Sequence, residues 1–272
     1  MRLAQSIRRS FLIGGTLATA LLITACATSP LGRSQLVLFP ESEMTQMGLS
    51  AYQEMKQQTP ASRSTVTNRY VQCVSEHIVR AMPNGNPAEW EVTVFDDAQA
   101  NAFALPGGKI GVYTGLLDVA ENQDQLATVI GHEVAHVLAR HSNERVSTSS
   151  LTQAGLQAVQ VAAGSSSPMK QQLFGLLGLG AQVGITLPFG RKQESEADLL
   201  GLDLMANAGF DPRASVLLWQ NMAKASGGQK PPEFMSTHPS NERRIIDLNE
   251  RIPSAMKLSL AARQSGSTPD CR

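Results

Sequence analysis

Two histidines and a glutamate form the pattern with the clearest chemistry, His132-Glu133-Val134-Ala135-His136. Histidines four apart on a helix differ by only about 40° around its axis, so both rings leave the same face. This arrangement suits two nitrogen ligands on one Zn²⁺, with Glu133 placed beside them to hold a water molecule. The residues around the motif are apolar on nearly every side: Val129, Ile130, Val134, Val137 and Leu138. The helix must therefore be buried, and its polar side chains need a partner such as a metal ion.

A third ligand is expected from the acidic segment that begins at Arg191. Glu194 and Asp198 are four apart and share a helix face, whereas Glu196 points about 200° away from Glu194 and is expected in solvent. Glu194 is therefore predicted to bind the metal. Asp198 is predicted to lie behind it and to accept the spare N–H of a ligand histidine, which would fix the tautomer of that ring.

Taken together, these motifs resemble the gluzincin metallopeptidases of the CAAX-prenyl-protease family, and most closely their non-transmembrane bacterial branch of periplasmic and lipoprotein members. Further matches are Asn101-Ala-Phe-Ala-Leu-Pro-Gly-Gly108, Thr237-His238-Pro239 and Glu242-Arg243, so the resemblance covers about residues 41–251. It implies His132, His136 and Glu194 as zinc ligands, Glu133 as general base and Asp198 as a second catalytic acid. This sequence has no long apolar spans, which argues against prenylated membrane substrates.

The function that the resemblance implies is a zinc-dependent endopeptidase with one Zn²⁺ per chain. Its substrates would be unfolded or misassembled envelope proteins, in protein quality control, and the envelope assembly machinery would be a partner. The segment Asn101–Leu105 is either an edge strand that pairs with extended polypeptide or part of simple sheet packing. The alternative functions are a metal-binding, chaperone-like lipoprotein and a structural envelope lipoprotein with little proteolysis.

His238, which precedes Pro239, is expected close to the zinc. Its ring has two roles open to it. As a fourth ligand it would displace the water and hold the enzyme latent, and as a donor it would stabilise the oxyanion. The other two histidines are expected outside the site: His77 on a polar stretch of a helix, and His141 at the C-terminal end of the motif helix.

Hydrophobic periodicity predicts an α+β fold, mostly helical, in which a zincin-like metallopeptidase domain carries a small sheet beside the motif helix. The domain is expected over residues 41–252, followed by a C-terminal tail at 253–272. The last clear helix is Ser240–Arg251. The Gly-rich segment 164–190 is interpreted either as a mobile lid or as a packed helical hairpin.

The N-terminus has the features of a targeting segment. Residues 1–25 read as a lipoprotein signal peptide, with a basic start, a short apolar run and Cys26 as the lipidated residue. An ordinary signal peptide and an uncleaved anchor are the alternatives. Residues 26–40 would be a lipidated tether that binds the membrane. The predicted location is the bacterial outer membrane, on its periplasmic side.

Cysteine content and net charge limit the remaining choices. Cys73 and Cys271 either form a disulfide, which an oxidising compartment allows, or Cys73 is a buried free thiol. Lysine and arginine total 23, as do aspartate and glutamate, so no basic excess points to nucleic acid.

Overall fold

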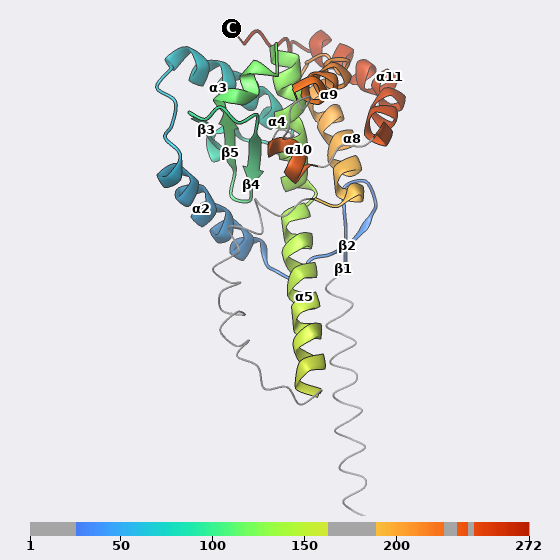
Figure 1. The fold of residues 1–272 in the computed structure, drawn as a ribbon. Helices are drawn as coiled ribbons and strands as arrows, with labels where there is room; N and C mark the ends of the chain where they lie inside the picture. The colour runs from blue at the N-terminus through green and yellow to red at the C-terminus, as the bar shows by residue number, and fades with distance from the viewer. Residues whose placement is uncertain (1–25, 163–188, 226–232, 239–241, 272) are drawn as a thin grey trace, which may run out of the picture.

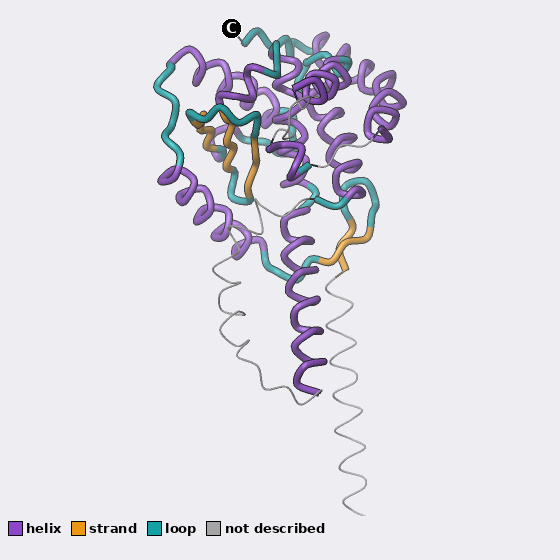
Figure 2. Tube along the Cα trace, viewed as in Figure 1, coloured by secondary structure: helices purple, strands orange, loops and turns teal. Residues whose placement is uncertain are grey.

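The computed structural model describes residues 26–162, 189–225, 233–238 and 242–271, and all statements below concern these residues. Figure 1 shows helices gathered around one small sheet, and Figure 2 shows the same arrangement by secondary structure. The strands are β1 (Cys26–Thr28), β2 (Ser34–Leu36), β3 (Glu91–Phe95), β4 (Ala102–Leu105) and β5 (Lys109–Tyr113). The α-helices are α2 (Glu41–Gln58), α3 (Thr65–Arg80), α4 (Gln123–Leu138), α5 (His141–Ala162), α8 (Arg191–Asn207), α9 (Ala214–Ala225), α10 (Glu233–Thr237) and α11 (Glu242–Gln264).

The three-stranded sheet has the order β3-β5-β4, with β3 parallel and β4 antiparallel to the central strand. The predicted strand at Asn101–Leu105 corresponds to β4, which is an edge strand. The sheet packs against α3 through β3 and against α4 through β4. Figure 1 shows α4 between this sheet and the helices α8 and α11.

Helix α4 carries the motif and is buried along almost its whole length, as its apolar sequence predicts. Asn122 caps its first turn by accepting hydrogen bonds from the amides of Asp124 and Gln125. Its residues pack in the main apolar core together with side chains from α3, α8, α9 and α11. A helix enclosed in this way holds its ligand side chains rigidly.

Two glycines set the distance between α4 and α8. A Cβ added to Gly201 would lie 2.7 Å from the backbone nitrogen of His132, and one added to Gly131 would lie 2.9 Å from the carbonyl oxygen of Gly201. Both contacts are with backbone atoms, which no change of side-chain rotamer can relieve. The absence of both side chains therefore brings the backbones of the two site-bearing helices into direct contact.

The prediction of an extended tether at residues 26–40 is wrong for the part that folds into β1 and β2. These strands form an antiparallel hairpin that packs on α5, and Arg33 in its turn forms ion pairs with Glu144 and Glu196. After the hairpin, the backbone amide of Leu38 donates to the Ser147 hydroxyl on α5. The charged and polar partners on α5 and α8 hold the segment against the domain.

The C-terminal region also differs from the prediction. Helix α11 continues to Gln264 through Pro253, well beyond the predicted end at Arg251, so residues 253–264 are not a separate tail. Cys271 forms a disulfide with Cys73 on α3, which ties the chain end to the N-terminal half of the domain. His77 lies beside this disulfide with its ring edge-on to Phe210.

The signal peptide predicted at residues 1–25 lies outside the described residues, as does the Gly-rich segment apart from its last two residues. Hydrophobic periodicity predicts a helix over residues 148–163, whereas helix α5 begins at His141. Among the helices that the structure describes, none combines the length and hydropathy needed to span a membrane.

The helix crossing leads to a first prediction, which concerns Gly201→Ala. The added Cβ meets backbone atoms of α4, and overpacking of this kind costs about 1–3 kcal/mol, more than the gain of about 1 kcal/mol from replacing a helical glycine. We expect a lower melting temperature and weaker zinc binding, measured by thermal denaturation and by competition with a chromogenic chelator.

Gly155→Ala is the matched control for this substitution. Gly155 is also helical, but it is exposed and an added Cβ would meet nothing within 4 Å. This variant should be as stable as the wild type or slightly more so, with unchanged zinc affinity. Equal behaviour of the two variants would contradict the role given to the crossing.

Candidate metal centre

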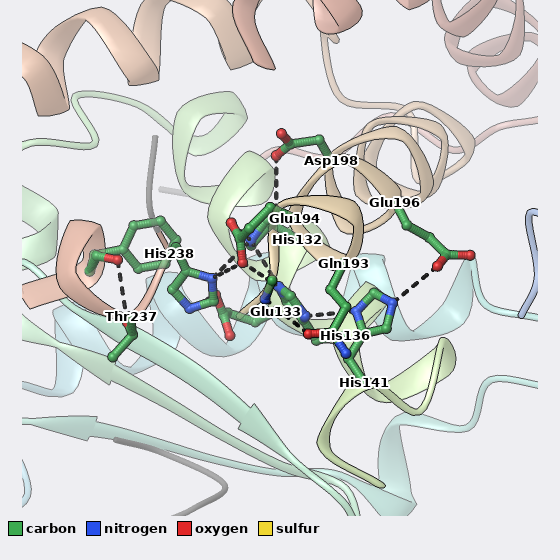
Figure 3. Close-up of polar contacts among 12 residues, drawn as sticks. His132, Glu133, His136, His141, Gln193, Glu194, Glu196, Asp198, Thr237 and His238 are labelled. Carbon is green, nitrogen blue, oxygen red and sulfur yellow. Dashed lines mark hydrogen bonds and ion pairs between the residues drawn. The ribbon is translucent and has the colours of Figure 1, made fainter. Parts of the chain in front are cut away.

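Four buried side chains, from two helices and from the residue after a third, converge on one point. His132 and His136 come from α4, Glu194 from the first turn of α8, and His238 follows the end of α10. One ligand atom from each lies within 4.8 Å of all the others. Figure 3 shows these side chains pointing toward one another. The structure thus brings the predicted ligands together, and it places His238 among them.

The distances between the donor atoms lie close to those of a tetrahedral site, and three of the four are slightly shorter. Nε2 of His132 lies 3.1 Å from Nε2 of His136 and 3.2 Å from Nδ1 of His238. Glu194 Oε1 lies 3.0 Å from Nδ1 of His238 and 3.5 Å from Nε2 of His136. Zinc bonds of about 2.0–2.2 Å in a tetrahedron require donor separations of about 3.3–3.6 Å. The cluster therefore has the donor set and the spacing to hold one metal ion.

The site is closed to solvent, and this burial shifts the ionisation of its members. Burial lowers the pKa of His136 well below its usual value, which favours the neutral ring that a metal requires. Burial also raises the pKa of the Glu194 carboxyl, but contacts with His136 and His238 outweigh it and hold that pKa far below its usual range. Glu194 is therefore ionised.

A buried acid and arginine stand behind His132. Asp198 Oδ1 lies 3.0 Å from His132 Nδ1, which orients the ring with Nε2 toward the cluster. Arg244 of α11 donates to both oxygens of Asp198, at 2.6 and 2.7 Å, and lies 2.8 Å from Glu194 Oε2. Its guanidinium also stacks on Trp219. Burial raises the pKa of the Asp198 carboxyl, but Arg244 more than reverses this and leaves it below its usual value.

Glu133 lies between the cluster and the sheet. Its Oε1 is 3.3 Å from His238 Nε2 and has no hydrogen bond of good geometry. Burial raises the pKa of this carboxyl, while the backbone amide of Ala104 on the edge strand β4 acts in the opposite direction. A carboxylate whose pKa is moved toward neutrality suits a general base.

Aromatic rings hold His238 in place. Its ring stacks on Phe234 with centroids 4.5 Å apart and on Phe189 at 5.0 Å. Phe189 also stacks on His136, at 3.7 Å. The His238 ring is therefore confined between two phenylalanines with Nδ1 at the ligand cluster.

Two expectations about the outer residues are wrong. Glu196 is not in solvent but only 5% exposed, because the hairpin covers the side of α8 that faces away from the cluster. His141 does not cap a helix end: its Nδ1 lies 2.8 Å from Nδ1 of His136, and its Nε2 lies 3.2 Å from Glu196 Oε2. Burial lowers the pKa of His141 to about 4, so the ring is neutral near pH 7.

Sequence reasoning also missed Arg33, Phe189 and Arg244. The resemblance pointed to Glu242-Arg243, but Arg243 is exposed and its neighbour Arg244 is the buried residue that contacts the site. Helical spacing offers the one signal for Arg244, since it shares an α11 face with the buried Leu248. No local pattern marks Arg33 or Phe189, because their contacts are with distant segments.

The comparisons with known proteins point to metallopeptidases. The model of Peptidase family M48 matches residues 65–252. Mitochondrial metalloendopeptidase OMA1 of Schizosaccharomyces pombe is 42% identical over 190 residues, which is 70% of this chain and 54% of the relative. Metalloendopeptidase OMA1, mitochondrial, of Homo sapiens is 30% identical, over 90% of this chain and 49% of the relative. Beta-barrel assembly-enhancing protease of Escherichia coli is 27% identical, over 87% and 49%.

The chain spans about half the length of these curated relatives. The comparisons contradict the predicted outer-membrane location, because relatives from fungi, a plant and vertebrates are mitochondrial by name. The prediction followed from the leader and Cys26 alone, and the similarity of the folded domain gives it no support. The comparisons likewise do not single out a CAAX-protease or bacterial lipoprotein branch.

A second prediction compares two aspartates of α8 that each pair with an arginine of α11. Asp198 and Arg244 have side chains only 3% and 1% exposed, whereas Asp203 and Arg251 are 20% and 40% exposed. Removing one partner of a buried pair costs about 3–5 kcal/mol, and removing an exposed pair costs about 0–1 kcal/mol. Asp198→Asn should therefore reduce the unfolding free energy far more than Asp203→Asn. Urea denaturation of the metal-free proteins measures both, and equal losses would contradict this account.

Proposed function

Because the chain belongs to Peptidase family M48, we propose that it is a zinc-dependent endopeptidase that cleaves unfolded or misassembled polypeptides in protein quality control. The observation that carries the proposal is the arrangement of Glu133 beside four metal-binding donors. A ligand cluster alone would serve a structural zinc equally well. A buried carboxylate next to it, with an oxygen that lacks a well-formed hydrogen bond, is what hydrolysis requires in addition.

The family assignment confirms the predicted zincin-like metallopeptidase domain, mostly helical with a small sheet. It also confirms zinc as the cofactor, for which His132, His136 and Glu194 form a site able to hold one ion. The individual catalytic roles below are our proposals.

Each residue has a distinct role in the proposed reaction. A zinc ion held by His132, His136 and Glu194 would supply Lewis acidity, which lowers the pKa of a bound water to about 7 and polarises a substrate carbonyl. Glu133 takes a proton from the attacking water and returns it to the leaving amine. Asp198 holds His132 in the tautomer that leaves Nε2 free, and Arg244 keeps Asp198 ionised and in position.

The position of β4 favours an extended substrate. It is the edge strand of its sheet, and the backbone amide of Ala104 acts on the Glu133 carboxylate. A peptide that added to this edge would run past the general base. Only unfolded or locally extended segments can pair in this way, so compact proteins would resist cleavage.

The names of the relatives bear on the substrates. Proteins from Yersinia pestis and Escherichia coli are called beta-barrel assembly-enhancing proteases. By analogy, misassembled proteins are the proposed targets here, and a protein assembly machinery is the proposed partner.

The general base gives a third prediction, tested with Glu133→Gln. Glutamine cannot accept the water proton, so casein hydrolysis should fall by at least about 100-fold while zinc stays bound. Glu43→Gln on the exposed face of α2 is the control and should keep the wild-type rate. Removal of zinc from the wild type with a chelator should reduce casein hydrolysis to the same extent. Full activity in Glu133→Gln would instead favour a chaperone-like or structural protein that binds metal without proteolysis.

The fourth prediction concerns His238. Its Nδ1 lies at donor distance from His132 and Glu194, which supports a latch in which the ring occupies the position needed by water. His238→Ala should then raise basal casein hydrolysis several-fold, and adding Glu133→Gln should abolish the gain. A fall in activity would support oxyanion stabilisation instead. An unchanged rate would exclude both roles.

A further inference from the structure

The two histidines of α4 are supported from behind in different ways. His132 has a carboxylate directly at its Nδ1, with an arginine behind the acid. His136 has no carboxylate at its Nδ1 among the described residues. Its Nδ1 contacts the ring of His141 instead, and the other nitrogen of that ring contacts the carboxylate of Glu196. Figure 3 shows Asp198 and Glu196 on different sides of α8, each directed toward one of these paths.

The donors and acceptors along the second path can be assigned from the geometry. His136 points Nε2 at the ligand cluster, so its proton lies on Nδ1, which donates to Nδ1 of His141 over 2.8 Å. Because His141 Nδ1 accepts this hydrogen bond, the proton of the His141 ring lies on Nε2, which donates to Glu196 Oε2 over 3.2 Å. Each ring has one tautomer that satisfies both of its contacts.

The carboxylate at the end of this path is held by the N-terminal hairpin. Arg33 donates through Nε to Glu196 Oε2 at 2.9 Å, and the backbone amide of Leu31 donates to Oε1 at 3.3 Å. The turn that presents them is closed by backbone hydrogen bonds between Ser29 and residues Gly32 and Arg33. Arg33 also binds Glu144 on α5 through both terminal nitrogens. Three consecutive hydrogen bonds thus connect the hairpin to the ligand cluster. They run from Arg33 to Glu196, from Glu196 to His141, and from His141 to His136.

We propose that Arg33, Glu196 and His141 are positioning residues that fix the tautomer and orientation of His136, which makes the hairpin part of the metal centre. This deepens the proposed function, because it assigns residues that prepare its zinc site. The hairpin residues lie outside the stretch that the family model matches. The three residues act through the His136 ring, because His141 contacts its Nδ1 and not the Nε2 that faces the ligand cluster.

Two glutamates bound to the same arginine provide a matched test. Glu196→Ala removes the acceptor of His141. Glu144→Ala removes the other anchor of Arg33 and an acceptor of Gln193, and it leaves every hydrogen bond of the path to His136 in place. Loss of a residue that orients a ligand typically weakens metal binding by about 10–100-fold. We expect that loss for Glu196→Ala and less than about threefold for Glu144→Ala, from zinc competition with a chromogenic chelator.

Substitution of His141 separates hydrogen bonding from packing. Glutamine can accept from His136 and donate to Glu196, so His141→Gln should keep zinc affinity within about threefold. His141→Leu fills similar space without either bond and should lose about 10–100-fold. The visible spectrum of the Co²⁺-substituted protein should be shifted in His141→Leu and nearly unchanged in His141→Gln, because the His136 ring reorients only in the former.

Arg33 has its own control. Arg33→Met should weaken zinc binding toward the Glu196→Ala value, whereas Arg213→Met, which removes an exposed ion pair with Asp211, should leave it unchanged. Equal zinc affinities for Glu196→Ala and Glu144→Ala, or for His141→Gln and His141→Leu, would overturn the proposal and reduce the hairpin to a structural support.

The readouts also separate this proposal from the proposed function. Zinc affinity and Co²⁺ spectra are measured without proteolysis. If the variants follow the expected order but the wild type does not digest casein, the positioning proposal stands and the peptidase proposal fails. If the wild type binds no zinc, both fail.

Discussion

The direct contact of α4 and α8 backbones is the constraint on which the metal centre depends. The ligands His132 and His136 lie on one helix and Glu194 on the other, so their separation is fixed by how closely the two axes approach. Gly131 and Gly201 allow backbone contact at the crossing. With larger residues there, the carboxylate would be too far from the imidazoles for one ion to bridge them. The packing of two small residues therefore sets the geometry of charged groups several ångströms away.

Burial removes water from the charged groups of this cluster, so their charges must be balanced by neighbouring groups. Three carboxylates, on Glu133, Glu194 and Asp198, are each no more than 5% exposed. Arg244 compensates two of them through direct contacts, and the buried Arg145 acts on Glu133 and Glu194 through its charge. The carboxylates still outnumber these two arginines. A bound cation would relieve this excess, so metal binding and folding are expected to support each other. The same burial keeps His136 neutral and therefore able to act as a ligand.

Local sequence patterns were sufficient for much of this arrangement. Helical spacing alone predicted that His132 and His136 share a face and that Glu194 and Asp198 share another, and α8 does begin at Arg191. These predictions succeed because they depend on residues within one or two turns of each other. The error for Glu196 came from the same rule. It gave the direction of the side chain correctly, but it could not show that another segment covers that side of the helix.

The parts that sequence reasoning missed depend on long-range contacts and on one left-handed residue between two helices. Arg33 and Glu196 are 163 residues apart, and no periodicity connects them. The position of His141 follows from Arg140, whose φ of 54° places it in the left-handed region between the end of α4 and the start of α5. This one residue interrupts the helix between α4 and α5 (Figure 1). His141, which an unbroken helix would direct away from His136, therefore contacts it instead. Because Glu196 lies on the flank of α8, it reaches His136 only through that ring. The interposed histidine is thus a consequence of the turn between two helices, and it explains why the two α4 ligands, four residues apart, are supported by such different segments of the chain.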